Sequence, residues 1–300
     1  MEPKPLPVVV AEAVAAAESL GAILAALQAR LGGPPLDPAV RDGVDSVLAA
    51  MGISDSLHAA PPQQASMFLD LGRAVAALVY DFVSHPSRAP GWSFDDPTVL
   101  GGMGAASASF AQAFDAIVPS LPGLESLRSP GGRFLDVGVG VGALAFGAAQ
   151  TWPSVHVTGI DIWGPSLVEA RRRVEEAGLG DRIEIREQPV QDLDDVGVFD
   201  LAWFPGPFIP PDVVQAGINA VARSVKPGGW VVYSGFNGPG PLGQATADLR
   251  AIRFGGRAFS EAGSVALLES AGLQDARVLP PMTWLPGRLT VARKPEQPPQ

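Results

Sequence analysis

The stretch RFLDVGVGVGALAFGAAQTWPSVHVTGID, residues 133–161, decides the fold of this chain. An apolar segment, Arg133–Val137, leads into three glycines at alternate positions and then into the small residues Ala143–Gln150. A second apolar segment, Val155–Ile160, ends on the carboxylate of Asp161. Continuous β-branched and aliphatic runs are typical of strands that helices cover on both faces. The stretch therefore predicts a strand, a turn, a helix and a parallel second strand of an α/β sheet.

The glycines of this stretch indicate a ligand. Gly138, Gly140 and Gly142 permit a tight turn and let the backbone approach a molecule that a Cβ atom would exclude. Asp161 lies about 20 residues beyond the first glycines, where an acid usually holds ribose hydroxyls. Its alternative role is to cap the helix expected over Pro165–Ala177. The pattern predicts a nucleoside-bearing cofactor.

Two classes of cofactor fit such a turn. Gly138-x-Gly140-x-x-Ala143 satisfies the dinucleotide pattern, in which a pyrophosphate rests on the helix N-terminus. Asp136 discriminates between the classes, because an anion at the strand end would repel a phosphate and would suit an ammonium group. The run from Asp136 to Gly142 therefore resembles motif I of the class I S-adenosylmethionine-dependent methyltransferases.

The resemblance extends over residues 133–293. Asp161 matches the acid that closes strand two and binds both ribose hydroxyls, Phe199–Trp203 looks like the strand-four motif, and Lys226–Trp230 looks like the turn before strand five. It implies a Rossmann-like, seven-stranded, mostly parallel sheet with a C-terminal antiparallel hairpin strand. It also implies S-adenosylmethionine as cofactor, S-adenosylhomocysteine as product, and small-molecule methylation of the kind found in secondary metabolism.

The resemblance further implies which residues contact the cofactor. Many relatives hold the adenine amino group with an acid, whereas this chain has Gln188-Pro189-Val190 in that region, so the Gln188 side chain or the Val190 backbone takes that role. The expected cofactor residues are Asp136, Gly138, Gly140, Gly142, Asp161, Ile162, Gln188, Val190 and Phe204.

The methyl acceptor is expected beyond strand four, at the carboxyl edge where open α/β sheets bind ligands. Amino-group methyltransferases carry an Asp/Asn-Pro-Pro-aromatic box there, but here Phe204 or Gly206 stands in place of the polar residue, which favours a hydrophobic or aromatic acceptor methylated on oxygen or carbon. His85 is the candidate general base. The expected acceptor-pocket residues are Tyr80, Trp92, Phe94, Trp203, Pro205 and Phe208.

The chain divides by pattern into a helical and an alternating part. Residues 1–120 are expected to form a helical lid or dimerisation region, 121–132 a linker, 133–294 the cofactor-binding domain, and 295–300 a disordered tail. Within the first part, Val8–Leu31 carries apolar residues three or four apart and is more apolar than a lone surface helix requires, which suggests a homodimer.

Composition excludes several classes of partner. The net charge of −10 disfavours nucleic acid, since phosphate binding needs clustered lysine and arginine. The absence of cysteine removes disulfides, thiolate nucleophiles and cysteine-bound metals, and we expect no metal site. Glu12 and Glu18 interrupt the apolar N-terminus, so neither a membrane span nor a signal peptide is expected, and we expect a cytoplasmic protein.

Three alternatives to a small-molecule methyltransferase stay open. The helical region could host an extended chain, which would make a peptide carboxylate the acceptor. The glycine turn also allows an NAD-dependent oxidoreductase. Finally, no catalytic side chain is obligatory for methyl transfer, so a non-catalytic module that only binds the cofactor has the same sequence pattern.

Overall fold

The computed structural model describes residues 4–282 and 287–296. The chain forms two compact units, each with its own core. The first unit is Met1–Ser84 with Asp96–Ala106, and the second is His85–Asp95 with Ser107–Gln300.

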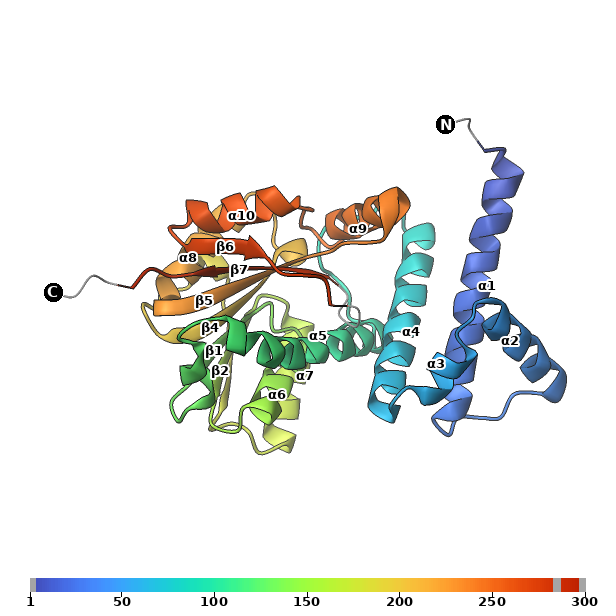
Figure 1. Ribbon diagram of the computed structural model, residues 1–300, viewed down its shortest axis with the longest axis horizontal. Coiled ribbons are helices and arrows are strands. Elements are labelled where there is room, and N and C mark those ends of the chain that lie inside the picture. Colours follow the sequence, from blue (N-terminus) through green and yellow to red (C-terminus); the bar gives the residue numbers. More distant parts are fainter. Residues whose placement is uncertain (1–3, 283–286, 297–300) are drawn as a thin grey trace. The chain divides into compact units, whose positions relative to one another are not determined.

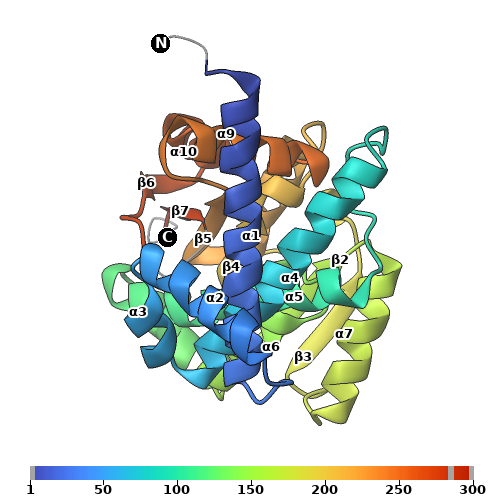
Figure 2. The ribbon, with the colours of Figure 1, turned by 90° about the vertical axis from the view of Figure 1, so that its right-hand side faces the viewer.

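The first unit is entirely helical. Its elements are α1 (Leu6–Arg30), α2 (Pro38–Ala50), α3 (Ser54–Ala59), α4 (Pro62–Ser84) and the first part of α5 (Pro97–Ile117). The carboxylate of Asp37 accepts a hydrogen bond from the N–H of Ala39 and so caps α2. Figure 2 shows α2 beside the C-terminal half of α1, where Leu27 and Leu48 share an apolar core.

The N-terminal half of α1 is exposed within the part of the first unit that the structure describes. Its apolar side chains from Leu6 to Val14, including Val8, Val9 and Val10, are between 43% and 73% exposed. By length and composition alone, α1 is long and apolar enough to cross a membrane, with a mean hydropathy of 1.8 over an 18-residue window. A single apolar helix near the N-terminus is weak evidence for a membrane span, because core helices and signal sequences share this composition.

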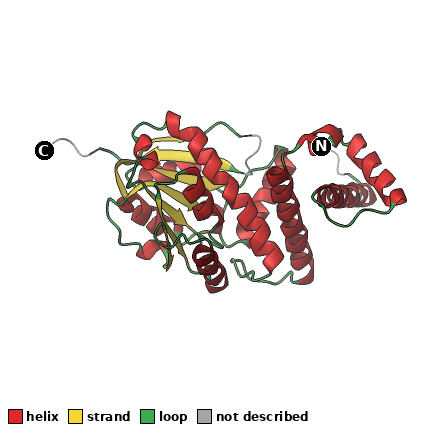
Figure 3. Cartoon of the chain, turned by 90° about the horizontal axis from the view of Figure 1, so that it is seen from below, coloured by secondary structure: helices red, strands yellow, loops and turns green. Residues whose placement is uncertain are grey.

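The second unit contains a seven-stranded sheet in the order β3-β2-β1-β4-β5-β7-β6. The strands β1 to β5 are parallel, while β7 pairs antiparallel with both β5 and β6. Figure 3 shows this sheet flanked by helices. The strands are β1 (Arg133–Val137), β2 (His156–Asp161), β3 (Ile183–Glu187), β4 (Phe199–Pro205), β5 (Val225–Gly235), β6 (Gln274–Val278) and β7 (Arg288–Arg293). The predicted fold class is confirmed.

Helices cover both faces of the sheet, as the continuous apolar strands require. One apolar cluster joins the sheet to α6, α7 and the end of α5, and another joins its opposite face to α8 and α10 (Figure 1). The helices are α6 (Ala143–Thr151), α7 (Gly164–Glu176), α8 (Val214–Ser224), α9 (Gly240–Arg253) and α10 (Glu261–Ser270). Short 3-10 turns are η1 (Val118–Ser120), η2 (Leu124–Arg128), η3 (Val190–Asp192) and η4 (Gly206–Phe208).

The structure differs from the expected boundaries in three places. Helix α5 extends from Pro97 to Ile117, and its second half belongs to the second unit rather than to the expected helical region 1–120, because Phe110 and Phe114 pack in the sheet's core. Strand β5 begins at Val225 and includes the Lys-Pro-Gly-Gly segment. The short helix α3 was not expected. Residues 283–286, between the two strands of the expected hairpin, and most of the expected tail over 295–300 lie outside the described residues.

Candidate cofactor and acceptor site

The glycine turn after β1 has the backbone that its sequence requires. Gly138, Gly140 and Gly142 have φ values of 68°, 53° and 80°, which side chains with a Cβ rarely adopt. The N–H of Gly138 donates to the carbonyl of Ile160 at 2.8 Å, which joins the turn to β2. A Cβ on Gly138 would lie 3.2 Å from the Pro205 ring, so the end of β4 abuts the turn.

Asp136 is a buried carboxylate at the end of β1. It is 1% exposed, and its Oδ2 atom has no hydrogen-bond partner among the described residues. Burial raises the pKa of Asp136 well above its usual value, and the negative charge of Asp161 raises it further, while the N–H of Ala145 opposes both. Ala145 lies in the first turn of α6, whose N-terminus carries positive potential.

This carboxylate discriminates between the two possible cofactor classes. An unsatisfied buried acceptor costs about 1–3 kcal/mol, more if it is charged, so a ligand that donates to Oδ2 would recover that energy. A pyrophosphate would instead meet a like charge whenever Asp136 is ionised. The unpartnered acceptor at this turn fits the ammonium group of a methionine moiety, which would donate to it.

Asp161 joins the glycine turn to the end of β2. Its Oδ2 accepts from the N–H of Gly140 at 2.8 Å, and its Oδ1 accepts from Ile162 and Trp163 at 2.7 and 2.9 Å. A carboxylate offers about four acceptor positions, so one position on Oδ2 is left for a ribose hydroxyl. The alternative role as the N-cap of α7 is wrong, because the N-cap is Trp163 and the bonds precede the helix.

We therefore expect Asp161→Ala to have two effects. It removes the expected ribose contact and frees the N–H of Gly140 in the glycine turn, so we expect affinity for S-adenosylhomocysteine to fall about tenfold or more. The free energy of unfolding falls by about 1–3 kcal/mol because the N–H of Gly140 loses its partner. Calorimetric titration and denaturant unfolding measure the two, and unchanged affinity would show that Asp161 only supports the turn.

The expected adenine contacts lie beside Asp161. The N–H of Gln188 donates to the Asp161 carbonyl at 2.9 Å, while its side-chain amide donates to the carbonyl of Asp192 at 3.1 Å. The side chain of Val190 is buried in the core, so only its backbone is available to a ligand. Ile162 is 65% exposed. The cofactor roles of these three residues stay predictions.

Two residues expected at the ligand belong to the core instead. Phe204 is fully buried and stacks on Tyr233, and alternation along β4 points it toward the α8 face of the sheet. Trp203 points to the opposite face, where its ring packs 4.6 Å from Phe110 and 5.3 Å from Phe114. The assignments of both side chains to a ligand pocket are corrected, because both faces of β4 are covered.

Three of the expected acceptor residues do come together. The ring of Trp92 lies 5.2 Å from that of Phe94 and 5.5 Å from that of Phe208. Phe254 and Phe236, which the sequence analysis did not select, complete this aromatic cluster; the ring of Phe254 lies 5.1 Å from that of Phe208 and 5.9 Å from that of Phe236. Phe236 directly follows β5. Because ligands bind at the carboxyl ends of parallel strands, this position could have identified Phe236 as an acceptor-pocket residue from the sequence.

Hydrogen bonds to backbone carbonyls hold the aromatic cluster next to the cofactor residues. The indole N–H of Trp163 donates to the carbonyl of Phe94 at 2.9 Å, and Trp163 is itself bound to Asp161. The N–H of Gly91 donates to the carbonyl of Arg253 at 3.1 Å. The loop 85–95 and the end of α9 therefore lie together at the carboxyl edge of the sheet.

Two further candidates, Tyr80 and His85, are not among the residues whose ring contacts define this cluster. Tyr80 lies on α4 in the first unit and is 75% exposed. His85 is exposed at the start of the loop that carries Trp92. Their roles in acceptor binding and proton transfer stay predictions.

Asp200 lies at the opposite, amino edge of the sheet. Its carboxylate accepts from the N–H of Arg133 and from Lys226, both at 2.8 Å, and from the hydroxyl of Ser126 at 3.0 Å. These bonds join the start of β1 and the start of β5 to η2. Asp200 therefore stabilises the sheet and lies away from the glycine turn.

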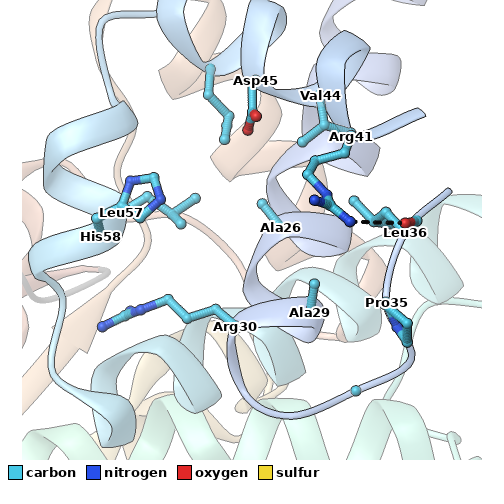
Figure 4. Close-up of a pocket in the computed structure, with 12 residues that line it drawn as sticks. Ala26, Ala29, Arg30, Pro35, Leu36, Arg41, Val44, Asp45, Leu57 and His58 are labelled. Carbon is cyan, nitrogen blue, oxygen red and sulfur yellow. Dashed lines mark hydrogen bonds between the residues drawn. The ribbon is translucent and has the colours of Figure 1, made fainter. Parts of the chain in front are cut away.

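The first unit contains a separate, half-open cavity of about 420 Å³ between α1, α2 and α3 (Figure 4). Its two arginines bind backbone carbonyls, Arg30 that of Ala60 and Arg41 that of Leu36. His58 is likewise bound to the carbonyl of Ser54 at 2.6 Å. Its two arginines and His58 are thus already partnered, whereas the carboxylate of Asp45, which also lines the cavity, has no hydrogen bond or ion pair with the residues that the structure describes.

Comparison with known proteins identifies the central part of the chain. Residues 134–229 match the family model described as a methyltransferase domain. A ubiquinone biosynthesis O-methyltransferase of Bordetella avium is 37% identical over 109 residues, which are 36% of this chain and 44% of that protein. A ubiquinone/menaquinone biosynthesis C-methyltransferase of Geotalea daltonii is 35% identical over 117 residues, 37% of this chain and 48% of that protein. The chain thus spans about half the length of the curated relatives it matches.

Solved structures extend the similarity of fold to both units. The S-adenosylmethionine-dependent methyltransferase SibL matches with a TM-score of 0.65 and 22% identity, covering 97% of this chain and 98% of that one. Human N-acetylserotonin methyltransferase, solved with S-adenosylmethionine, matches with a TM-score of 0.60 and 17% identity over 98% of this chain and 99% of that one. Residues 134–229 therefore match a methyltransferase domain, and the fold of the chain is that of S-adenosylmethionine-dependent methyltransferases such as SibL.

Proposed function

We propose that this protein transfers a methyl group from S-adenosylmethionine to an oxygen atom of a small, hydrophobic, ring-containing acceptor. The observation that carries the proposal is the buried Oδ2 atom of Asp136 next to the glycine turn, which has no hydrogen-bond partner among the described residues. The named O-methyltransferases among the relatives support oxygen as the acceptor atom.

The residues at the carboxyl edge would have distinct roles. Asp136 holds the ammonium group of the cofactor, and Asp161 accepts a ribose hydroxyl at its one remaining position. When bound, S-adenosylmethionine supplies a methyl group on a sulfonium, which is already electrophilic. The chain then has mainly to align the acceptor with that methyl group and to exclude water, and such alignment is worth on the order of 7–11 kcal/mol of barrier.

The aromatic cluster would provide the acceptor surface. Phe208 lies at the end of the turn η4, which begins directly after Pro205, and Pro205 is next to the glycine turn. An acceptor that contacts the cluster would therefore lie close to the cofactor. The turn η4 itself, Gly206-Pro207-Phe208, carries no titratable side chain. A phenol that is already partly ionised needs no strong base, and His85 remains the candidate for an acceptor that does.

A screen with methyl-labelled cofactor tests the proposal. Purified protein is titrated with S-adenosylhomocysteine and with NAD, and then incubated with labelled S-adenosylmethionine and a panel of phenols, aromatic carbon nucleophiles and peptide carboxylates. Binding of S-adenosylhomocysteine but not NAD, followed by label on a phenolic oxygen, supports it. NAD binding would favour the oxidoreductase. Cofactor binding without any transfer would favour the non-catalytic module, and label on carbon or on a peptide would correct the acceptor.

We also propose that α1 mediates a homodimer. The exposed apolar side chains of its N-terminal half, Leu6–Val14, form a surface that a second copy of the chain would bury. Light scattering at micromolar concentration is expected to give twice the chain mass of 31.0 kDa. The double variant Val10→Glu, Val14→Glu should be monomeric, whereas Val40→Glu, an exposed residue on α2, should remain dimeric. A monomeric wild-type protein would contradict the proposal.

A further inference from the structure

Helix α9 places a guanidinium group against the aromatic cluster. The Cζ atom of Arg250 lies 5.5 Å above the ring of Phe236, within the range of a cation–π contact. Phe236 in turn packs 5.8 Å from Phe208 and 5.9 Å from Phe254. Arg250 is therefore at the border of the aromatic surface on which the acceptor would lie.

Arg250 has no acidic partner within the described ranges, 4–282 and 287–296. This is unexpected in a chain with 31 acids against 21 lysines and arginines. Arg128, Arg172 and Arg186 each bind a carboxylate at 2.7 Å or less. The nearest acid in sequence, Asp248, is instead bound to the side-chain amide of Gln244 at 2.7 Å.

The surroundings of Arg250 favour an anion. Part of the side chain is exposed, yet loss of hydration lowers the pKa of its guanidinium group from the usual value. A guanidinium group that stacks on a ring keeps its edge N–H groups in the plane, so it can bind a carboxylate with two parallel hydrogen bonds at the same time. A ring bearing a carboxylate could thus contact the aromatic cluster and Arg250 together.

We propose that Arg250 determines specificity for an acceptor that carries a carboxylate on its aromatic ring. This inference rests on the proposed function, because it assigns the anionic group of the same acceptor. It makes Arg250 a binding residue for the part of the acceptor that does not react. The alternative is purely structural: Arg250 lies in the last turn of α9, where a cation stabilises the helix dipole.

Matched acid and amide probes test the proposal. Hydroxybenzoic and hydroxynaphthoic acids and their primary amides share ring and hydroxyl but differ in charge. For the wild-type protein we expect at least one acid to have a kcat/KM about tenfold or more above that of its amide. Arg250→Gln should lower kcat/KM for the acid about 10- to 100-fold and change that for the amide less than twofold. Arg250→Lys should retain part of the preference, since it keeps the charge but not the planar fork.

Arg257→Gln is the matched control. Arg257 also lies over a phenylalanine ring, Phe259 at 4.5 Å, but Phe259 packs against Tyr233 rather than against the aromatic cluster. We expect this variant to keep the wild-type preference. Affinity for S-adenosylhomocysteine should be unchanged in every variant, which shows that the fold is intact.

The outcomes separate this inference from the proposed function. If acids and amides are methylated equally, or if Arg250→Gln keeps the preference for acids, the inference is wrong while the methyltransferase stands. If no probe is methylated, calorimetric binding of the acids to the protein with S-adenosylhomocysteine decides: binding weakened by Arg250→Gln supports the carboxylate site without the reaction. Absence of binding by every acid overturns the inference.

Discussion

Asp136→Asn is expected to weaken binding of S-adenosylhomocysteine about 10- to 150-fold, which corresponds to the roughly 1.5–3 kcal/mol of a hydrogen bond to a charged group. Asparagine has the same shape but no charge to offer an ammonium group. Isothermal titration calorimetry measures the change. Wild-type affinity in the variant, or a bound ligand whose amino group lies away from residue 136, would refute the role assigned to this carboxylate.

The same substitution should change how stability depends on pH. Because burial and the nearby Asp161 raise the pKa of Asp136 in the folded state, the folded protein binds this proton more tightly than the unfolded chain. The resulting stability is fully present below the unfolded-state pKa of about 3.9 and is lost as the pH rises through the folded-state pKa, at about 1.4 kcal/mol per pH unit. Asp136→Asn lacks this loss. Without cofactor, its free energy of unfolding should therefore increase relative to that of the wild-type protein as the pH rises from acidic to neutral.

Proton release links the two effects. An ammonium group favours the ionised carboxylate, so binding below the folded-state pKa of Asp136 should release a proton from the wild-type protein and none from Asp136→Asn. Calorimetry in two buffers of different ionisation enthalpy detects this release. An equal release by both proteins would assign the proton to another group.

Asp115→Asn is the control of opposite sign. Burial alone would raise the pKa of Asp115, but hydrogen bonds from Trp152 and Arg128 outweigh it and hold the pKa below the usual value. Its contribution to stability is therefore present above the unfolded-state pKa and is lost as the pH falls through the folded-state pKa. The acid side of the stability curve should change in this variant, and cofactor affinity should not.

Asp200→Ala is expected to have the largest effect on stability, lowering the free energy of unfolding by about 2–4 kcal/mol. It leaves the N–H of Arg133 and the ammonium of Lys226 without their acceptor, and it removes the hydrogen bond that joins Ser126 of η2 to the sheet. The value lies below that of a fully buried ion pair because the Lys226 side chain is 37% exposed. Denaturant unfolding measures it.

Cofactor affinity distinguishes this structural role from a catalytic one. Asp200→Ala should bind S-adenosylhomocysteine as the wild-type protein does under conditions where both are folded, since Asp200 lies at the amino edge of the sheet. Asp200→Asn, which keeps one acceptor oxygen, should lose less stability. A strong loss of affinity in the folded Asp200→Ala protein would mean that the two edges of the sheet are coupled.

The sequence by itself determined the sheet, the glycine turn and the two acids that flank it. Each depends on a local rule: apolar runs form buried strands, glycine adopts positive φ, and an acid ending a strand lies at its carboxyl edge. Asp136 and Asp161 could therefore be placed at the turn without knowledge of any distant segment.

The tertiary structure alone decided how side chains far apart in the sequence are partnered. The sequence predicts ligand contacts for Trp203 and Phe204, but the end of α5 covers one face of β4 and Tyr233 of β5 packs on the other. The aromatic cluster includes Phe236 and Phe254, and has Arg250 at its border, because η4, α9 and the loop 85–95 lie together there. Periodicity states which side of an element is buried, whereas the identity of the neighbour depends on how the whole chain packs.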